Sequence, residues 1–284
     1  MNNALTISEL TKTYKGFVLD NVSFSVPSGS IVGLIGENGA GKSTIINAVL
    51  GLIQKDSGCV SLFGKNEPDN AAKEQIGVVF DGSIFPENLS PKKINRIMQN
   101  IYTSWDRQTY FKLLDQFAIP LDKQIKKFSK GMKMKLAISV ALSHQPKLLI
   151  LDEATSGLDP VIRDDILDML LDFMQNEEHS ILLSSHITGD LEKIADYIVF
   201  IHEGQIVFFK SKDELMEEYG IVKCGAEQFD RFDESDIVTY RKMDYEWQVL
   251  VSDRNRIQKK HPNVLVVPAT IDEIMLLYVK GENG

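Results

Sequence analysis

The sequence lacks any apolar run long enough to cross a bilayer. A membrane-spanning helix needs about 20 consecutive apolar residues, whereas the longest candidates, at 148–151 and 198–201, have the length of a strand. The opening segment MNNALTISEL also lacks the basic and apolar regions of a secretory signal. We therefore expect no secretion and no direct membrane span.

Cysteines and basic residues are scarce as well. The 284 residues include two cysteines, Cys59 and Cys224, which are far apart and have no metal-ligand spacing; this usage suggests structural thiols in a reducing compartment. Lys and Arg number 31 against 40 Asp and Glu, a formal net charge of −9. Because binding a phosphate backbone needs a basic surface, nucleic acid is not expected as the main partner. Together these features indicate a cytoplasmic protein.

The patterning along the chain predicts a large α/β unit followed by a small appendage. Residues 1–30 alternate short β-rich runs with turn signals, which predicts antiparallel strands. A β-branched run at 31–36 stops at glycine and precedes a helical pattern, and residues 90–145 are mostly helical in spacing. Another helix is expected to begin after Ser211 and to end at Gly220. Residues 220–284 then predict a small α+β region of about 60 residues.

A glycine-rich loop is the strongest chemical motif. GENGAGKS at 36–43 fits G-x-x-x-x-G-K-S/T between a predicted strand and a predicted helix. Its glycines let the backbone aim N–H groups at phosphate oxygens, its lysine reaches the β- and γ-phosphates, and its serine hydroxyl suits Mg²⁺. A glycine-rich turn matching by chance has odds of about one in a hundred in this length. The predicted ATP-binding residues are Gly36, Glu37, Asn38, Gly39, Ala40, Gly41, Lys42, Ser43 and Thr44.

The segment KLLILDEA supplies two carboxylates at the end of an apolar strand. Asp152 suits a Mg²⁺ ligand, and Glu153 suits a base that deprotonates an attacking water. An Asp-Glu pair after a strand is also typical of a helix start, and that interpretation would be preferred for this segment alone. The phosphate loop earlier in the chain favours the catalytic interpretation.

The order of the phosphate loop, FSKGM, LILDEA, SGLD and SSH resembles the ATP-binding subunits of bacterial ABC transporters, in particular the exporter-type, antibiotic-resistance and YtrB-like branch. The resemblance covers residues 1–219. It implies a P-loop NTPase fold with a RecA-like core, an N-terminal antiparallel β subdomain and a helical lobe at about 88–145, with residues 220–284 as the α+β appendage. It also implies ATP and Mg²⁺ as cofactors, a second ATP-binding subunit in a head-to-tail dimer, and a separate transmembrane permease that attaches this chain to the inner face of the cell membrane.

Several residue roles follow from the resemblance alone. Ser129 and Gly131 match a signature that contacts the γ-phosphate bound by the other subunit, although the stretch also fits a basic start of an amphipathic helix. Asp159 matches a loop that contacts the partner's phosphate loop. His186 matches a histidine that contacts the γ-phosphate, and Tyr14 matches an aromatic that stacks on adenine. The simpler alternatives are a structural histidine and a surface tyrosine.

The sequence departs from this family pattern at three positions. Lys130 and Met132 stand where the signature usually has a second glycine and a glutamine, and Asp81 stands where the loop between the lobes usually has a glutamine. We expect Asp81 to contact the metal through water. The predicted catalytic residues are thus Lys42, Glu153 and His186, and the predicted metal ligands are Ser43, Asp152 and Asp81.

The function predicted from these motifs is ATP hydrolysis that drives a transporter, in the direction of export. A soluble ABC-type ATPase acting on DNA, ribosomes or protein assembly is one alternative, but such proteins usually carry two cassettes, long coiled-coil insertions or basic surfaces, which the sequence lacks. The other is an ATP-gated dimerisation module that hydrolyses poorly because of Asp81.

Overall fold

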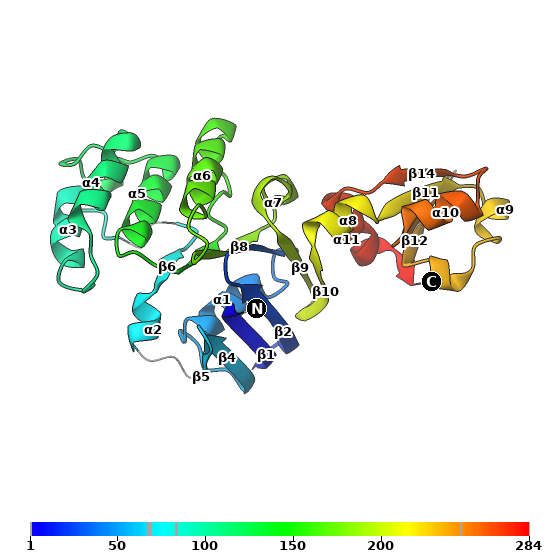
Figure 1. Cartoon of the computed structure of the whole chain (residues 1–284), viewed down its shortest axis with the longest axis horizontal. Coiled ribbons are helices and arrows are strands. Elements are labelled where there is room, and N and C mark those ends of the chain that lie inside the picture. The colour runs from blue at the N-terminus through cyan, green and yellow to red at the C-terminus, as the bar shows by residue number, and fades with distance from the viewer. Residues whose placement is uncertain (1, 67–69, 83–84, 245, 284) are drawn as a thin grey trace.

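The computed structural model describes residues 2–66, 70–82, 85–244 and 246–283. The N-terminal segment forms an antiparallel sheet with the strand order β2-β1-β4-β5, at the bottom of Figure 1. This confirms the predicted N-terminal β subdomain. Its strands are β1 (Asn3–Tyr14), β2 (Phe17–Pro27), β4 (Ser57–Leu62) and β5 (Lys65–Asn66).

A second, mainly parallel sheet forms the centre of the molecule. Its order is β10-β9-β3-β8-β7-β6, with β10 antiparallel to β9 and the other neighbours parallel. The carboxyl ends of its parallel strands therefore meet at one edge, where ligands bind in folds of this kind. The strands are β3 (Ile31–Ile35), β6 (Ile76–Val79), β7 (Leu148–Asp152), β8 (Ser180–Ser185), β9 (Tyr197–His202) and β10 (Gln205–Ser211).

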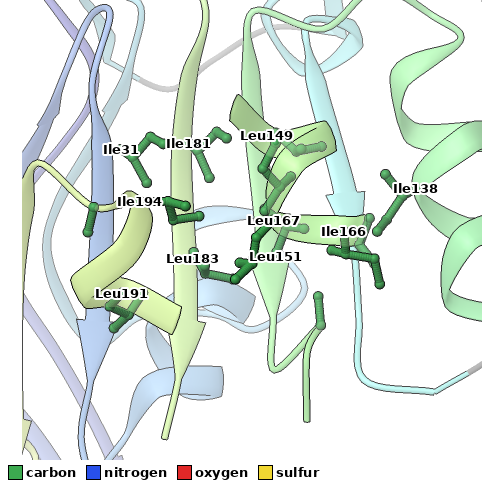
Figure 2. Close-up of a cluster of buried hydrophobic side chains, with 14 of the residues drawn as sticks. Ile31, Ile138, Leu149, Leu151, Ile166, Leu167, Ile181, Leu183, Leu191 and Ile194 are labelled. Carbon is green, nitrogen blue, oxygen red and sulfur yellow. The ribbon is translucent and has the colours of Figure 1, made fainter. Parts of the chain in front are cut away.

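The central sheet is buried on both faces, which explains its nearly continuous apolar strands. Alternate residues of β7 and β8 belong to different hydrophobic clusters: Leu149 and Leu183 face one layer of helices, whereas Leu148 and Leu182 face the other side together with Ile45 of α1 (Lys42–Val49). Figure 2 shows the first layer, in which helices α6 (Pro160–Phe173) and α7 (Thr188–Ile194) cover the sheet. Burying each such side chain contributes about 1.5–3 kcal/mol.

The predicted helical lobe is confirmed between β6 and β7, at the left of Figure 1. Pro91 occupies the first turn of its first long helix, and Asp106 caps the next helix by accepting from the amides of Gln108 and Thr109. The helices of this region are α3 (Pro91–Met98), α4 (Arg107–Gln116), the 3₁₀ turn Ile125–Lys127 and α5 (Lys130–Leu142), and the short α2 (Asn70–Glu74) lies before β6. Among the described residues, no helix combines the length and apolar character needed to cross a membrane.

The C-terminal residues form a five-stranded antiparallel sheet with the order β14-β11-β13-β12-β15. Along the chain, the first four of these strands and the two helices that connect them follow the order βαββαβ, which is the ferredoxin-like arrangement. The strands are β11 (Gly220–Cys224), β12 (Thr239–Lys242), β13 (Trp247–Val251), β14 (Leu265–Pro268) and β15 (Glu282–Asn283). The helices are α9 (Ala226–Phe229), a 3₁₀ turn at Glu234–Asp236, α10 (Arg254–Lys260) and α11 (Ile271–Lys280).

The predicted end of the helix after Ser211 is wrong. Helix α8 (Lys212–Glu217) stops earlier, and Gly220 instead begins β11. A Cβ at this glycine would lie 2.7 Å from the Cβ of Arg254. The glycine therefore permits a close approach between chain segments rather than closing a helix.

The appendage packs directly on the rest of the chain, at the right of Figure 1. The ring of Tyr278 in α11 lies 6.2 Å from that of Phe200 and 5.6 Å from that of Phe208, measured between centroids. The carboxylate of Glu192 in α7 accepts a hydrogen bond from the amide of Ile271 at 3.1 Å. A division of the chain at residue 220 stays a prediction, since one hydrophobic cluster includes side chains from both parts.

Candidate active site

A cleft of about 340 Å³ opens at the carboxyl edge of the central sheet. It collects side chains from the phosphate loop and from the loops that follow β6, β7 and β8, which explains how residues distant in sequence meet. The residues lining it are Phe17, Asn38, Gly39, Gly41, Lys42, Ser43, Thr44, Asp81, Glu153, Ser156 and His186.

The phosphate loop has the backbone that its glycines allow. Gly41 has a φ of 118° directly before α1, a conformation that residues with a side chain rarely adopt. Gly36 passes so close to β9 that a Cβ there would collide with the carbonyl oxygen of Ile201. The first turn of α1 thus faces the cleft with its N–H groups available to phosphate oxygens.

Lys42 is held over this loop by three acceptors. Its ammonium donates to the carbonyl oxygens of Gly36 at 2.8 Å and Glu37 at 3.3 Å, and it lies 3.2 Å from Oε1 of Glu153. The residue is 5% exposed. A buried ammonium with this geometry is positioned to meet phosphate oxygens that enter the cleft.

Glu153 lies between the two other predicted catalytic residues. One carboxylate oxygen faces Lys42, and the other is hydrogen bonded to Nδ1 of His186. The backbone of Glu153 has a φ of 54°, in the left-handed region, and its amide donates to both the carbonyl and the hydroxyl of Ser184. This turn takes the chain sharply out of β7 at the edge of the cleft.

Asp152 is the last residue of β7 and is 8% exposed. Its Oδ1 accepts a hydrogen bond of 2.6 Å from the hydroxyl of Ser184. Within the described residues there is no group of three or more His, Cys, Asp or Glu that could hold a metal without other ligands. Mg²⁺ characteristically binds one or two carboxylates together with substrate phosphates, so the oxygen donors of Asp152 and Ser43 fit such an ion.

Two of the departures from the family pattern contact each other. Oδ1 of Asp81 lies 3.2 Å from the ammonium of Lys130, and both side chains are about half exposed. Lys130 also lies beside the SGLD loop, because a Cβ on Gly157 would be 3.2 Å from its ammonium. Lys130 therefore joins the loop after β6 to the starts of α5 and α6.

The remaining signature residues lie outside the cleft of their own chain. Ser129 and Asp159 are exposed and cap helices: Ser129 accepts from the amide of Met132, and Asp159 from that of Ile162. Gly131 packs tightly, since a Cβ there would lie 2.5 Å from Cδ1 of Ile162. Of the described residues that line the cleft, none is Ser129, Gly131 or Asp159.

Phe17, which the sequence analysis missed, lines the cleft, whereas Tyr14 does not. The two residues pair across the β1–β2 hairpin, so their side chains leave the same face of the sheet. Phe17 also borders a neighbouring hollow of about 410 Å³ that includes Val18 and His202. In the sequence, the position of Phe17 directly after the Lys15-Gly16 turn was the feature from which it could have been predicted.

Known proteins share this architecture. The ABC transporter family matches residues 19–156. The chain is 37% identical to the lantibiotic transport ATP-binding protein SrtF of Streptococcus pyogenes, covering 75% of this chain and 94% of that protein. It is 34% identical to the bacitracin transport ATP-binding protein BcrA of Bacillus licheniformis, covering 73% and 69%. It is 31% identical to the ABC transporter ATP-binding protein YtrB of Bacillus subtilis, covering 76% and 74%.

The fold comparison agrees with the sequence comparison. A solved ATP-binding subunit of an ABC transporter superimposes with a TM-score of 0.68 at 29% identity, covering 75% of this chain and 91% of that one. The chain therefore belongs to the family of ABC transporter ATP-binding proteins, which bind and hydrolyse ATP.

Proposed function

We propose that this ATPase works as a head-to-tail dimer with a second ATP-binding subunit and drives a separate membrane permease. One observation carries the proposal: among the described residues, the signature serine Ser129 does not line the phosphate-binding cleft of its own chain, and it is exposed elsewhere on the surface. A second copy, or a related subunit, would complete both halves. The hydroxyl of Ser129, the amide of Gly131 and the helix start behind them then face the γ-phosphate of the partner, and Asp159 faces the partner's phosphate loop.

In the proposed mechanism the chain's own residues hold the triphosphate and move one proton. Lys42 binds the β- and γ-phosphates, and the carboxylate of Glu153 accepts a proton from the attacking water. The water oxygen bonds to the γ-phosphorus as its bond to the ADP oxygen breaks, which yields ADP and phosphate. His186 orients Glu153 through the hydrogen bond to Nδ1 and contacts the γ-phosphate.

The proposed metal site uses two oxygen donors of this chain. Mg²⁺ held by the hydroxyl of Ser43 and the carboxylate of Asp152 supplies, when bound, positive charge that offsets the charge of the β- and γ-phosphates. In this proposal Asp81 reaches that ion through water, and its carboxylate also pairs with Lys130. Tyr14 remains the proposed stacking partner of adenine, with Phe17 beside it.

We place the protein in the cytoplasm, at the inner face of the cell membrane, where the permease holds it. Two relatives are named for lantibiotic and bacitracin transport, which supports a peptide-type cargo, and we propose export as the direction. The net charge of −9 favours protein partners over nucleic acid.

The substitution Glu153→Gln tests the proposal. Glutamine keeps the size and hydrogen bonding of glutamate but removes the proton acceptor, so turnover should fall about 10²-fold or more. The variant should still bind ATP and should accumulate as an ATP-stabilised dimer in size-exclusion chromatography with Mg²⁺ and ATP. As a control, Glu178→Gln removes an exposed carboxylate paired with Lys147 and should leave turnover unchanged. Wild-type turnover by Glu153→Gln would contradict the assignment.

A further inference from the structure

Ser184 lies where strands β7 and β8 reach the active-site edge of the sheet. It pairs with Asp152 across the two parallel strands, and it is fully buried, with 0% of its surface exposed. Its hydroxyl donates to Oδ1 of Asp152 at 2.6 Å. The same oxygen accepts the amide of Glu153 at 3.1 Å, and the carbonyl oxygen of Ser184 accepts that amide at 3.2 Å.

The direction of these hydrogen bonds is fixed by chemistry. A hydroxyl has one proton to donate, a carboxylate only accepts, and a backbone amide only donates. The amide of Glu153 therefore donates to Ser184, and Ser184 donates to Asp152. Because Oδ1 of Asp152 is engaged in this way, the hydrogen bond fixes the rotation of the carboxylate and leaves Oδ2 and the second lone pair of Oδ1 for a metal.

The backbone of Glu153 needs support of this kind. Its φ of 54° is sparsely populated for residues other than glycine, so the surroundings must hold it. Ser184 provides two acceptors for the amide of that residue. With the turn held, the Glu153 carboxylate lies 3.2 Å from Lys42 and in hydrogen-bond contact with His186.

We propose that Ser184 is a positioning residue that fixes the orientation of the Asp152 carboxylate and of Glu153 with one hydroxyl. The inference rests on the proposed roles of Asp152 and Glu153. The neighbouring Ser185 provides a contrast, because its hydroxyl accepts the amide of Ile187 at 2.9 Å at the turn before α7. The hydroxyls of two adjacent serines thus have different partners, and that of Ser184 is hydrogen bonded to the active-site residues Asp152 and Glu153.

The test compares Ser184→Ala with Ser184→Thr, which keeps the hydroxyl. Ser139→Ala is the matched control: Ser139 is also 0% exposed, but its hydroxyl donates to the carbonyl of Lys135 within α5. The measurements are binding of a fluorescent ATP analogue over a Mg²⁺ titration, the same binding in EDTA, and ATP turnover. Losing a hydrogen bond to a metal ligand typically weakens metal affinity at least tenfold.

We expect Ser184→Ala to need about tenfold more Mg²⁺ for half-maximal binding of the analogue and for turnover, with unchanged binding in EDTA. Ser184→Thr and Ser139→Ala should follow the wild-type titration. If the alanine variant does not fold, Ser184→Cys should show the shift, since a thiol is a weak hydrogen-bond partner.

Two results would overturn the inference and can be told apart. If the wild type depends on Mg²⁺ but a folded Ser184→Ala or Ser184→Cys variant shows the same Mg²⁺ titration as the wild type, only the positioning role of Ser184 is overturned. A wild type that binds and hydrolyses ATP equally well without Mg²⁺ would overturn the proposed metal role of Asp152, and this inference with it.

Discussion

The carboxylate of Asp81 lies 3.2 Å from the ammonium of Lys130, so two positions at which the sequence leaves the family pattern are joined within one chain. Asp81 follows β6, which lies at one edge of the central sheet, and Lys130 begins helix α5 of the helical lobe. Because both side chains are about half exposed, the pair contributes only about 0–1 kcal/mol to stability. Its effect is expected on the coupling between the sheet and the lobe rather than on folding.

The first prediction separates the two partners of that pair. Asp81→Asn should shift the Mg²⁺ dependence of ATP turnover, because it removes the negative charge proposed to face the metal through water. Asp81→Gln should be partly active, since it restores the group usual in the family. Lys130→Met breaks the pair but leaves the carboxylate, so its Mg²⁺ dependence should match that of the wild type. Steady-state turnover over a Mg²⁺ titration decides the matter: equal curves for wild type, Asn and Gln would show that Asp81 is not part of the site.

A second prediction tests whether Ser129 acts on the partner's nucleotide. Ser129→Arg places bulk and charge at the proposed contact, and Lys42→Ala removes the ammonium from its own cleft. Each variant alone should be inactive, whereas a mixture should regain part of the turnover because a mixed dimer contains one intact composite site.

The control for this experiment is a mixture of Lys42→Ala with the Lys42→Ala/Ser129→Arg double variant, which has no intact site and should stay inactive. Titration with a fluorescent ATP analogue should show normal binding by the isolated Ser129→Arg chain. A loss of that binding would mean that Ser129 contacts the nucleotide of its own chain, and the head-to-tail proposal would be wrong.

The third prediction concerns the packing of Gly131 against Ile162. Alanine favours a helix by up to about 1 kcal/mol over glycine, but its Cβ would lie 2.5 Å from Cδ1 of Ile162, and overpacking typically costs about 1–3 kcal/mol. Gly131→Ala should therefore destabilise the wild type. It should destabilise less beside Ile162→Val, which lacks Cδ1 and keeps only the Cγ atoms, at 3.1 Å and 3.6 Å from the added Cβ. Urea unfolding of the four proteins gives the coupling energy, and additive effects would contradict the contact.

The sequence alone predicts the phosphate-binding end of the site well, because its information is local. A strand, a glycine-rich loop and a helix start follow one another in the chain, so Lys42 and Ser43 could be placed without any long-range contact. Glu153 was predicted from its place after an apolar strand together with the phosphate loop, and His186 only through the family pattern. The structure brings both into the same cleft. The fold class followed from the same order of motifs.

Features that depend on pairing between distant segments escaped the sequence analysis. The contact of Asp81 with Lys130 and the bonds of Ser184 are set by how strands and helices pack, which no periodicity reports. Gly220 resembled a helix end because glycine is common there, whereas its actual constraint comes from Arg254. The alternation in the sequence also predicts Tyr245 and Trp247 on one face of a half-buried strand, but Tyr245 lies outside the described residues.

The last prediction uses the buried His144, which connects the central sheet to the helical lobe. Its Nε2 is 3.1 Å from the carbonyl oxygen of Ile76 and therefore carries the proton, and its ring stacks on that of Tyr102 at 4.1 Å. Burial lowers the pKa of this imidazole below the ordinary 6.5, although its backbone hydrogen bonds and the charge of Glu74 act in the opposite direction.

The sign of the pH effect follows from that shift. Between the lowered folded pKa and the unfolded value near 6.5, the unfolded chain binds the proton more readily, so the free energy of unfolding decreases as the pH falls below about 6.5. The decrease contributed by this residue is at most about 1.4 kcal/mol per pH unit. His144→Gln keeps an N–H donor but does not titrate, so its stability should fall less between pH 7.5 and 5.5. Urea unfolding at several pH values measures this, and parallel curves for the two proteins would show that His144 does not titrate on unfolding.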